Sequence, residues 1–157
     1  MDCTISLIAA VASNGVIGNG NEIPWYHPED LEHFRETTIG HTLLLGRKTF
    51  QSVNGPLDQR DHIVLSQSWT ESQHENVTVA RNKTEAANII AQKGVERIFV
   101  CGGGTVYEQY MDEADELIIT HVPGAPAGDV HFPIIGEEWS VTERDERDEF
   151  VIARYER

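Results

Sequence analysis

Short apolar runs alternate with amphipathic segments along the whole chain, and this alternation constrains the fold more than any other feature of the sequence. The apolar runs predict strands at residues 4–12, 42–45, 62–66, 77–80, 97–101, 116–122, 139–144 and 149–155. The amphipathic segments predict helices at residues 28–38, 47–53, 84–93 and 104–111, and loops are predicted at 13–27 and 123–129. Strands that alternate with helices are typical of parallel sheets, and the polar segment 145–148 favours a hairpin. We therefore expect an α/β fold with a mixed, mostly parallel central sheet of about eight strands, four flanking helices and an antiparallel C-terminal hairpin.

The chain shows neither an internal repeat nor a low-complexity linker, so a single domain is expected over residues 1–157. No apolar run approaches the ~20 residues of a membrane span, and the acidic start of the chain lacks the basic flank of a signal peptide. We expect a cytoplasmic protein without a membrane partner. The cysteines, Cys3 and Cys101, are expected to be buried free thiols, with a disulfide as the alternative.

The net charge is strongly negative, because 26 acidic residues face 12 lysines and arginines, giving −14. Nucleic acid is excluded as an expected partner, since binding its phosphates requires the opposite charge. The acids are spread along the chain, so they repel one another in dilute buffer and are screened by salt. Our hypothesis is a monomeric protein of a salt-rich cytoplasm; the alternative is an ordinary acidic protein.

The segment VCGGGTVYEQY contains a strand that runs into three glycines and then a helix. A helix N-terminus presents unpaired N–H groups and partial positive charge, and glycines allow a large anion to approach the backbone. The segment lacks both the G-x-G-x-x-G dinucleotide pattern and the Walker pattern. It predicts a phosphate site, with a tight turn that binds no ligand as the alternative.

The segment LLLGRKTF resembles the first, because a strand ends at a glycine and a helix begins with Arg47 and Lys48. Ligands of open α/β sheets bind at the carboxyl ends of the strands. These two cations could therefore hold a second phosphate group, although surface solubility is an equally good explanation.

The helix predicted at 28–38 begins with Pro28, and two acids, Glu29 and Asp30, follow in its first turn. Acids there stabilise the helix dipole, and Glu29 alone would serve that purpose. Asp30 lies four residues before Phe34, so the carboxylate lies on or near the apolar stripe. A functional Asp30 should be desolvated, with a raised pKa, and able to hold a proton or pair with a cationic or amidine-like ligand.

The histidines show no spacing typical of a metal site, so no metal is expected. No serine or cysteine stands in a nucleophile motif, so acyl transfer is not expected.

Taken together, these motifs resemble the dihydrofolate reductase family from about residue 5 to residue 155. The resemblance rests on ISLIAAVASNGVIGNGNEIPW, PEDLEHF, GRKTFQSV, VCGGGTVYEQY and DELIITHV followed by GDVHFP, in this order. It implies reduction of 7,8-dihydrofolate to 5,6,7,8-tetrahydrofolate by NADPH, with the loop 13–27 acting as a lid.

The resemblance also implies the substrate site. Asp30 would bind the 2-amino group and N3 of the pterin, Trp25 would hold an ordered water near it, and Thr120 would hydrogen-bond the carboxylate. Arg60 would clamp the α-carboxylate of the glutamate tail. The pterin and aminobenzoyl groups would be walled by Ile8, Leu31, Phe34, Val53 and Leu57.

For the cofactor, the resemblance implies that Ala10, Ile17 and Gly18 flank the nicotinamide, with Tyr107 near it. The pyrophosphate would lie against Gly102, Gly103, Gly104, Thr105 and Val106, with a cis Gly102–Gly103 peptide. The 2′-phosphate of the adenosine, and with it the preference for NADPH over NADH, would depend on Arg47, Lys48 and Ser66, with Arg81 as a further candidate. Thr49 would also bind the cofactor.

Two departures from the family pattern are relevant. Before Arg60 the family usually has Pro-Gly, whereas this chain has Asp58 and Gln59, which places an acid beside a site for an anionic substrate. Thr105 stands where the family often has a basic or polar residue. The alternatives to a dihydrofolate reductase are the pyrimidine reductase of riboflavin synthesis, which would not be expected to carry the PEDLEHF pattern, and a non-catalytic nucleotide-binding module.

Overall fold

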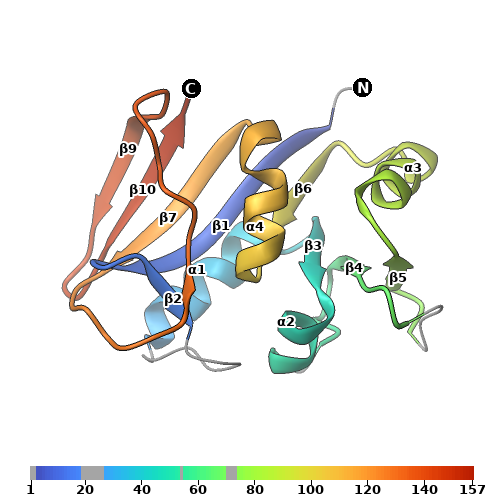
Figure 1. The fold of residues 1–157 in the computed structure, drawn as a ribbon, viewed down its shortest axis with the longest axis horizontal. Helices are drawn as coiled ribbons and strands as arrows, with labels where there is room; N and C mark the ends of the chain where they lie inside the picture. The colour runs from blue at the N-terminus through green and yellow to red at the C-terminus, as the bar shows by residue number, and fades with distance from the viewer. Residues whose placement is uncertain (1–2, 19–26, 54, 70–73) are drawn as a thin grey trace.

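The structure is a computed structural model in which residues 3–18, 27–53, 55–69 and 74–157 are described. An eight-stranded sheet with the order β5-β4-β3-β6-β1-β7-β10-β9 forms its centre (Figure 1). The strands of this sheet are β1 (Thr4–Ala12), β3 (Thr42–Gly46), β4 (Asp61–Leu65), β5 (Val77–Ala80), β6 (Arg97–Val100), β7 (Glu116–Val122), β9 (Ser140–Glu146) and β10 (Val151–Glu156). The α/β fold and the predicted number of strands in the sheet are confirmed.

The sheet is parallel except at one edge. β1 pairs in parallel with β6 and β7, β3 with β4 and β6, and β4 with β5. β10 pairs antiparallel with both β7 and β9, which confirms the C-terminal hairpin. Leu43, Leu44 and Leu45 of β3 are all fully buried, as expected for a central strand covered on both faces.

Four α-helices flank the sheet in the described part of the chain. They are α1 (Pro28–Thr38), α2 (Arg47–Ser52), α3 (Lys83–Lys93) and α4 (Gly104–Tyr110), and a short 3-10 helix, η1 (Met111–Glu113), follows α4. α4 crosses in front of the sheet in Figure 1, whereas α1 lies behind it. The predicted helices therefore all form, with ends that differ from prediction by no more than a residue. None of the helices in the described ranges has the length and apolar character needed to cross a membrane.

The predicted loop at 13–27 is wrong at one place. Residues Val16–Gly18 form a strand, β2, which pairs antiparallel with β8 (Val130–His131) as a separate two-stranded sheet. The side chain of Val16 is buried, so this short strand packs against the core. Strands of this length show no alternating pattern that sequence periodicity could detect. The rest of the predicted loop between residues 19 and 26 lies outside the described residues.

The two cysteines are free, as expected, but each is only partly buried. Cys3 lies before β1, and Cys101 follows the last residue of β6. Their partial exposure corrects the expectation that both thiols would be fully enclosed in the core.

Candidate active site

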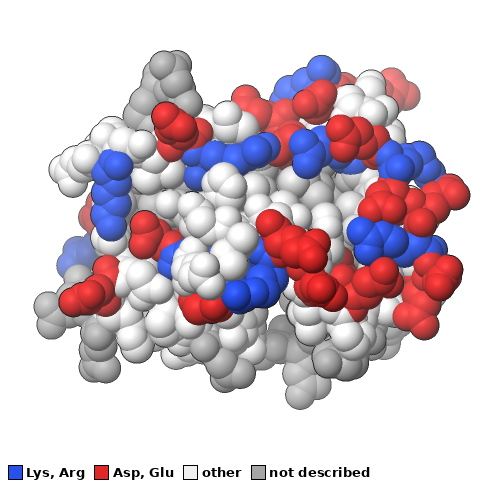
Figure 2. Space-filling model, turned by 180° about the vertical axis from the view of Figure 1, so that it is seen from behind, with Lys and Arg blue, Asp and Glu red and all other residues white. Residues whose placement is uncertain are grey.

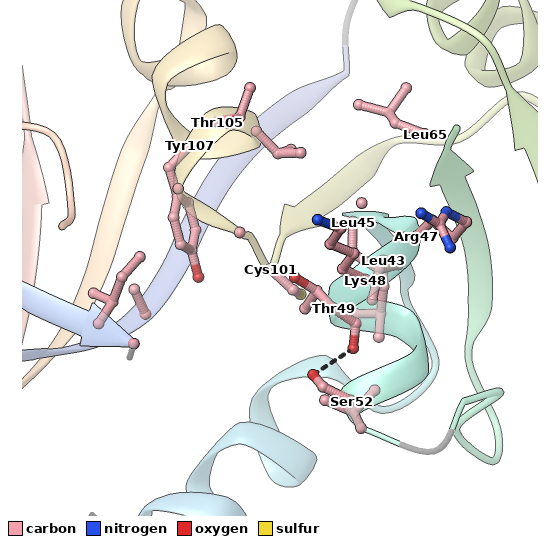
Figure 3. A pocket seen from close by; sticks show the side chains of 18 of the residues that line it. Leu43, Leu45, Arg47, Lys48, Thr49, Ser52, Leu65, Cys101, Thr105 and Tyr107 are labelled. Carbon is pink, nitrogen blue, oxygen red and sulfur yellow. Dashed lines mark hydrogen bonds between the residues drawn. The ribbon is translucent and has the colours of Figure 1, made fainter. Parts of the chain in front are cut away.

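A cavity of about 760 Å³ opens at the carboxyl ends of the central parallel strands. Figure 3 shows Thr105 and Tyr107 of α4 on one side of it and Arg47 and Lys48 of α2 on the other, with Cys101 between them. This is the edge at which open α/β sheets bind ligands. The sequence-predicted residues that line the cavity are Ile8, Ala10, Ile17, Gly18, Asp30, Leu31, Phe34, Arg47, Lys48, Thr49, Val53, Leu57, Ser66, Gly103, Gly104, Thr105, Val106 and Tyr107.

The two acids at the start of α1 lie in different surroundings. Glu29 is exposed and forms an ion pair with Arg147, whose Nη1 lies 3.0 Å from the Glu29 Oε1. Asp30 is partly buried, lines the cavity and accepts a hydrogen bond of 2.6 Å from the hydroxyl group of Thr120. This is the contact that the resemblance implied. One acid therefore lies at the surface, and the other presents its carboxylate to the cavity.

A small cavity of about 40 Å³ lies next to this carboxylate and is lined by Asp30, His33 and Thr120 among others. The Nε2 atom of His33 is buried without a hydrogen-bond partner in the described structure. Burial lowers the pKa of the His33 imidazole, with the nearby Asp30 charge acting in the opposite direction. A cavity of this size with polar groups on its walls can hold a water molecule. Trp25, which the resemblance places beside such a water, lies outside the described residues.

One end of the large cavity is apolar. Leu31 is 55% exposed and Val53 38% exposed, although both line the cavity together with Phe34 and Leu57. Large apolar side chains that remain exposed around a concave site indicate a surface that a ligand covers. A flat aromatic ligand would bury these side chains between α1 and α2.

The glycine turn after β6 forms another wall. The Gly102–Gly103 peptide is cis, as the resemblance implied, and Gly102 has a φ of 108°, which only glycine adopts readily. A Cβ atom on Gly102 would lie 3.1 Å from the Tyr107 ring, and one on Gly104 would lie 2.8 Å from Val130. The turn therefore brings bare backbone to the cavity, where a large anionic cofactor can approach it.

Tyr107 connects this turn to β1. Its hydroxyl group donates a hydrogen bond of 2.7 Å to the carbonyl oxygen of Ile8. Burial raises the pKa of Tyr107 well above its usual value, so the hydroxyl group stays protonated and continues to donate. The bond fixes the ring at the junction between the apolar end of the cavity and the glycine turn.

The start of α2 contributes two positively charged side chains to the cavity wall. Arg47 and Lys48 begin this helix directly after β3, and both line the cavity together with Thr49. The guanidinium carbon of Arg47 lies 6.0 Å from the centre of the Trp69 ring, within cation–π range. Ser66 follows β4, and its hydroxyl oxygen accepts hydrogen bonds from the backbone of Ser68 and Trp69. The basic side chains and this turn make a site suited to a phosphate group.

Among the described residues, four that were predicted from the sequence do not line the large cavity: Gly102, Thr120, Arg60 and Arg81. Thr120 lines the small cavity together with Asp30, and Gly102 directly precedes the two glycines, Gly103 and Gly104, that line the large cavity. Arg60 is only 5% exposed, and its Nη1 donates to the Thr38 hydroxyl oxygen over 3.1 Å. Its guanidinium carbon lies 6.0 Å from the centre of the Phe34 ring, so it sits directly behind a cavity wall.

Other lining residues were not identified from the sequence. Four of them, Leu45, Gly46, Leu65 and Cys101, stand at or directly after the carboxyl ends of β3, β4 and β6, and this position was a usable signal. The remaining ones, which carried no comparable signal, are Ala9, Leu43, Ser52, Gln67, Ser68 and Val130.

The described residues contain no group of three or more His, Cys, Asp or Glu side chains arranged to hold a metal ion. The cavity is suited instead to an extended organic ligand with phosphate groups at one end and a flat ring at the other. The bare glycine backbone and the cations of α2 suit the phosphate groups. Asp30 and its apolar neighbours suit the flat ring.

Comparison with known proteins agrees with this geometry. The dihydrofolate reductase family model matches residues 4–156. Dihydrofolate reductase HdrB of Haloferax volcanii is 40% identical over 159 residues, covering 96% of this chain and 82% of that protein. The dihydrofolate reductase of Haemophilus influenzae is 40% identical over 139 residues, covering 88% of this chain and 84% of that protein.

Among solved structures, dihydrofolate reductase from Enterococcus faecalis complexed with NADP(H) and RAB-propyl superimposes with a TM-score of 0.83. It is 30% identical in sequence, and the match covers 98% of this chain and 96% of that one. The sequence match and the structural match extend over nearly the whole chain. The chain therefore belongs to the dihydrofolate reductase family.

Proposed function

We propose that this chain reduces 7,8-dihydrofolate to 5,6,7,8-tetrahydrofolate with NADPH, and that Asp30 is the carboxylate that binds the pterin ring. Membership of the dihydrofolate reductase family supports the reaction and the cofactor. The observation that carries the assignment is the Asp30 carboxylate, held by Thr120 at 2.6 Å in the wall of a cavity that extends to the glycine turn.

The substrate takes the apolar end of the cavity. Asp30 binds the 2-amino group and N3 of the pterin, and this pair of contacts fixes the plane of the ring. Leu31, Phe34 and Leu57, with Ile8 and Val53, exclude water from both faces of the pterin and aminobenzoyl groups. Arg60 lies behind Phe34 and binds the carboxylate of the glutamate tail.

The cofactor takes the other end. The bare backbone at Gly103 and Gly104 receives the pyrophosphate, with Thr105 and Val106 beside it. Arg47 and Lys48 bind the 2′-phosphate together with Thr49 and Ser66, which favours NADPH over NADH. Ala10, Ile17 and Gly18 border the nicotinamide from β1 and β2.

When bound, NADPH would supply the hydride, from C4 of its nicotinamide ring to C6 of the pterin, and N5 of the pterin would gain a proton. The chain contributes chiefly by holding the two flat rings face to face, since correct positioning provides a large part of the rate. Asp30 polarises the pterin or helps to protonate it in a pocket with little water. Thr120 keeps the carboxylate oriented toward the ring.

We also propose that the protein works as a single domain in a salt-rich cytoplasm. The net charge of −14 and the 40% identity to a protein of Haloferax volcanii, a halophilic archaeon, support the salt-rich setting. Figure 2 shows acidic and basic side chains mixed along the edge formed by β9 and β10, where Asp145 pairs with Arg147 and Glu143 with Arg154. A high net charge of one sign also favours a monomer, because identical copies repel one another.

The direct test is the loss of NADPH absorbance with purified protein and dihydrofolate, across KCl concentrations from about 0.1 M to about 1 M and above. We expect a loss that depends on dihydrofolate, with NADPH preferred over NADH. Turnover of the riboflavin-pathway pyrimidine substrate in place of dihydrofolate, or binding of NADPH without turnover at any KCl concentration, would contradict the proposal.

A further inference from the structure

The carboxylate of Asp58 bridges two arginines that come from different elements. Arg35, near the end of α1, donates from Nη1 to Asp58 Oδ1 over 2.7 Å and from Nη2 to Asp58 Oδ2 over 3.0 Å. The Nη2 of Arg60, which precedes β4, lies 3.3 Å from the same Oδ1. The Arg35 guanidinium holds the pKa of the Asp58 carboxyl well below its usual range, so this carboxylate stays ionised at any physiological pH.

Arg60 has few donors left for another partner. Its Nε donates to the backbone oxygen of Asp58 over 3.0 Å, and its Nη1 donates to the Thr38 hydroxyl oxygen over 3.1 Å. These two bonds hold the buried guanidinium in place. The Nη2 atom faces the Asp58 side chain, which is 61% exposed. The Arg60 donor that points toward this exposed side chain is therefore already paired with a carboxylate of the chain itself.

This arrangement lies at the edge of the substrate cavity. Leu57, which directly precedes Asp58 in the chain, lines the cavity. Phe34, whose ring packs against Arg60, lines it as well. A carboxylate on the tail of a bound substrate would approach Arg60 from the side that Asp58 occupies. Two carboxylates cannot both take the same guanidinium donor, and like charges at that distance repel.

We propose that Asp58 is a specificity-determining residue, whose carboxylate competes with the carboxylate tail of the substrate for Arg60. The inference rests on the proposed function, because it assumes a dihydrofolate substrate with a glutamate tail. The competition has two consequences. The competition reduces the contribution of the glutamate tail to substrate affinity. It also makes that contribution nearly independent of salt, because one ion pair with Arg60 is exchanged for another.

The salt dependence of tail binding depends on how many ion pairs form and break. When a substrate carboxylate binds a free arginine, a new ion pair forms, and added salt weakens it. When the substrate carboxylate displaces Asp58, one ion pair with Arg60 forms and another is lost. Salt therefore weakens an ion pair in the free protein and in the complex alike, and the two effects largely cancel. Removal of the Asp58 charge should therefore strengthen tail binding and also make it more dependent on salt.

The experiment compares dihydrofolate with dihydropteroate, which has the same rings and lacks the glutamate. KM is measured for both, or an inhibition constant for a compound that binds without turnover, in wild type and in Asp58→Asn. We expect Asp58→Asn to lower KM for dihydrofolate about two- to fivefold, the range for an exposed ion pair. The value for dihydropteroate should change less, and the slope of KM against KCl should steepen for dihydrofolate alone.

Two further variants control for charge and for folding. Asp61→Asn removes an equal charge next to Arg60 from a residue that forms no ion pair with the described part of the chain, and it should leave the ratio of the two KM values unchanged. Arg35→Gln releases Asp58 to Arg60 and should raise KM for dihydrofolate, the opposite direction to Asp58→Asn. A purely structural role for the ion pair would instead move both variants in the same direction.

The outcomes separate this inference from the proposed function. If wild type reduces dihydrofolate while Asp58→Asn leaves the KM ratio and the salt slope unchanged, the competition is wrong and the proposed function stands. If Asp58→Asn changes both substrates equally, the competition is also wrong. If wild type reduces no dihydrofolate under any condition, the proposed function fails, and this inference fails with it.

Discussion

The hydroxyl group of Thr120 donates a hydrogen bond of 2.6 Å to Oδ1 of Asp30, although 90 residues separate the two in the chain. The threonine comes from β7 in the sheet, and the aspartate comes from α1 on its face. A threonine hydroxyl group has a single hydrogen, and here it goes to the carboxylate. The bond fixes the orientation of the carboxylate relative to the sheet, and with it the plane in which a pterin ring can lie.

Replacement of Thr120 by valine should therefore loosen Asp30 without removing it. We expect Thr120→Val to lower the free energy of unfolding by about 1.5–3 kcal/mol, the usual contribution of a hydrogen bond to a charged group, and to raise KM for dihydrofolate. Denaturant unfolding and steady-state kinetics measure the two effects. Thr120→Ser keeps the hydroxyl group and should recover most of the loss; a serine variant no better than the valine variant would contradict the role of this bond.

The cations at the start of α2 should determine the choice of cofactor. Because Lys48 lines the cavity, Lys48→Gln should raise KM for NADPH roughly tenfold, as expected for the loss of one charged contact. KM for NADH, which lacks the 2′-phosphate, should change little. Lys93→Gln, at the end of α3, removes the same charge elsewhere and serves as the control. Equal effects of Lys48→Gln on the two cofactors would show that Lys48 does not contact the 2′-phosphate.

Acid should destabilise the fold through buried histidines. His62 accepts a hydrogen bond at Nε2 from the Leu57 backbone and approaches the Asn76 carbonyl oxygen with Nδ1, so Nδ1 carries the proton of the neutral ring. Burial lowers the pKa of His62, and it has the same effect on His33 and His121. The unfolded chain consequently binds more protons than the folded one below about pH 6.5.

The free energy of unfolding should therefore be constant above that pH and fall below it. The slope is at most about 1.4 kcal/mol per pH unit for each histidine that stays neutral in the folded state. Chemical unfolding at a series of pH values from 8 down to 5 measures it, and His62→Gln should show a smaller slope than wild type. Stability that rises as the pH falls through this range would contradict the assignment.

Salt should stabilise the protein. With 26 acids against 12 lysines and arginines, repulsion outweighs the surface ion pairs, and screening shortens its range from about 10 Å at 0.1 M salt to about 3 Å at 1 M. Thermal unfolding in a KCl series should therefore show a midpoint that rises with salt. NaCl at matched ionic strength distinguishes general screening from specific binding of potassium. Greatest stability below 0.1 M KCl would rule out adaptation to a salt-rich cytoplasm.

The sequence was sufficient to locate Asp30 because the relevant chemistry is local. Two acids in one helical turn exceeded what the helix dipole requires, and the structure places Glu29 at the surface and Asp30 at the cavity. The two segments in which a strand runs through glycine into a helix could also be placed at the ligand site from the sequence, since the carboxyl ends of parallel strands meet at one edge of the sheet. Gly103 and Lys48 line the same cavity for this reason.

Features that depend on contacts between distant segments were not readable. The pairing of β2 with β8 joins strands too short to show a period. The contact of Asp58 with Arg35 and Arg60 depends on how the end of α1 packs against the turn before β4. No local sequence pattern predicts that packing. The departure from the family at Asp58 indicated a difference, but only the geometry showed which arginines the acid binds.

The most direct test of the role of Asp30 is the turnover of Asp30→Asn at neutral pH, measured beside wild type with saturating NADPH and dihydrofolate in high KCl. Asparagine keeps the size of the side chain and removes the carboxylate. We predict that kcat/KM falls by a factor of about 100 to 10,000, the contribution of a positioned acid or base, while Glu29→Gln changes it only a few fold. Undiminished turnover of Asp30→Asn, with NADPH binding intact, would contradict the central role given to Asp30.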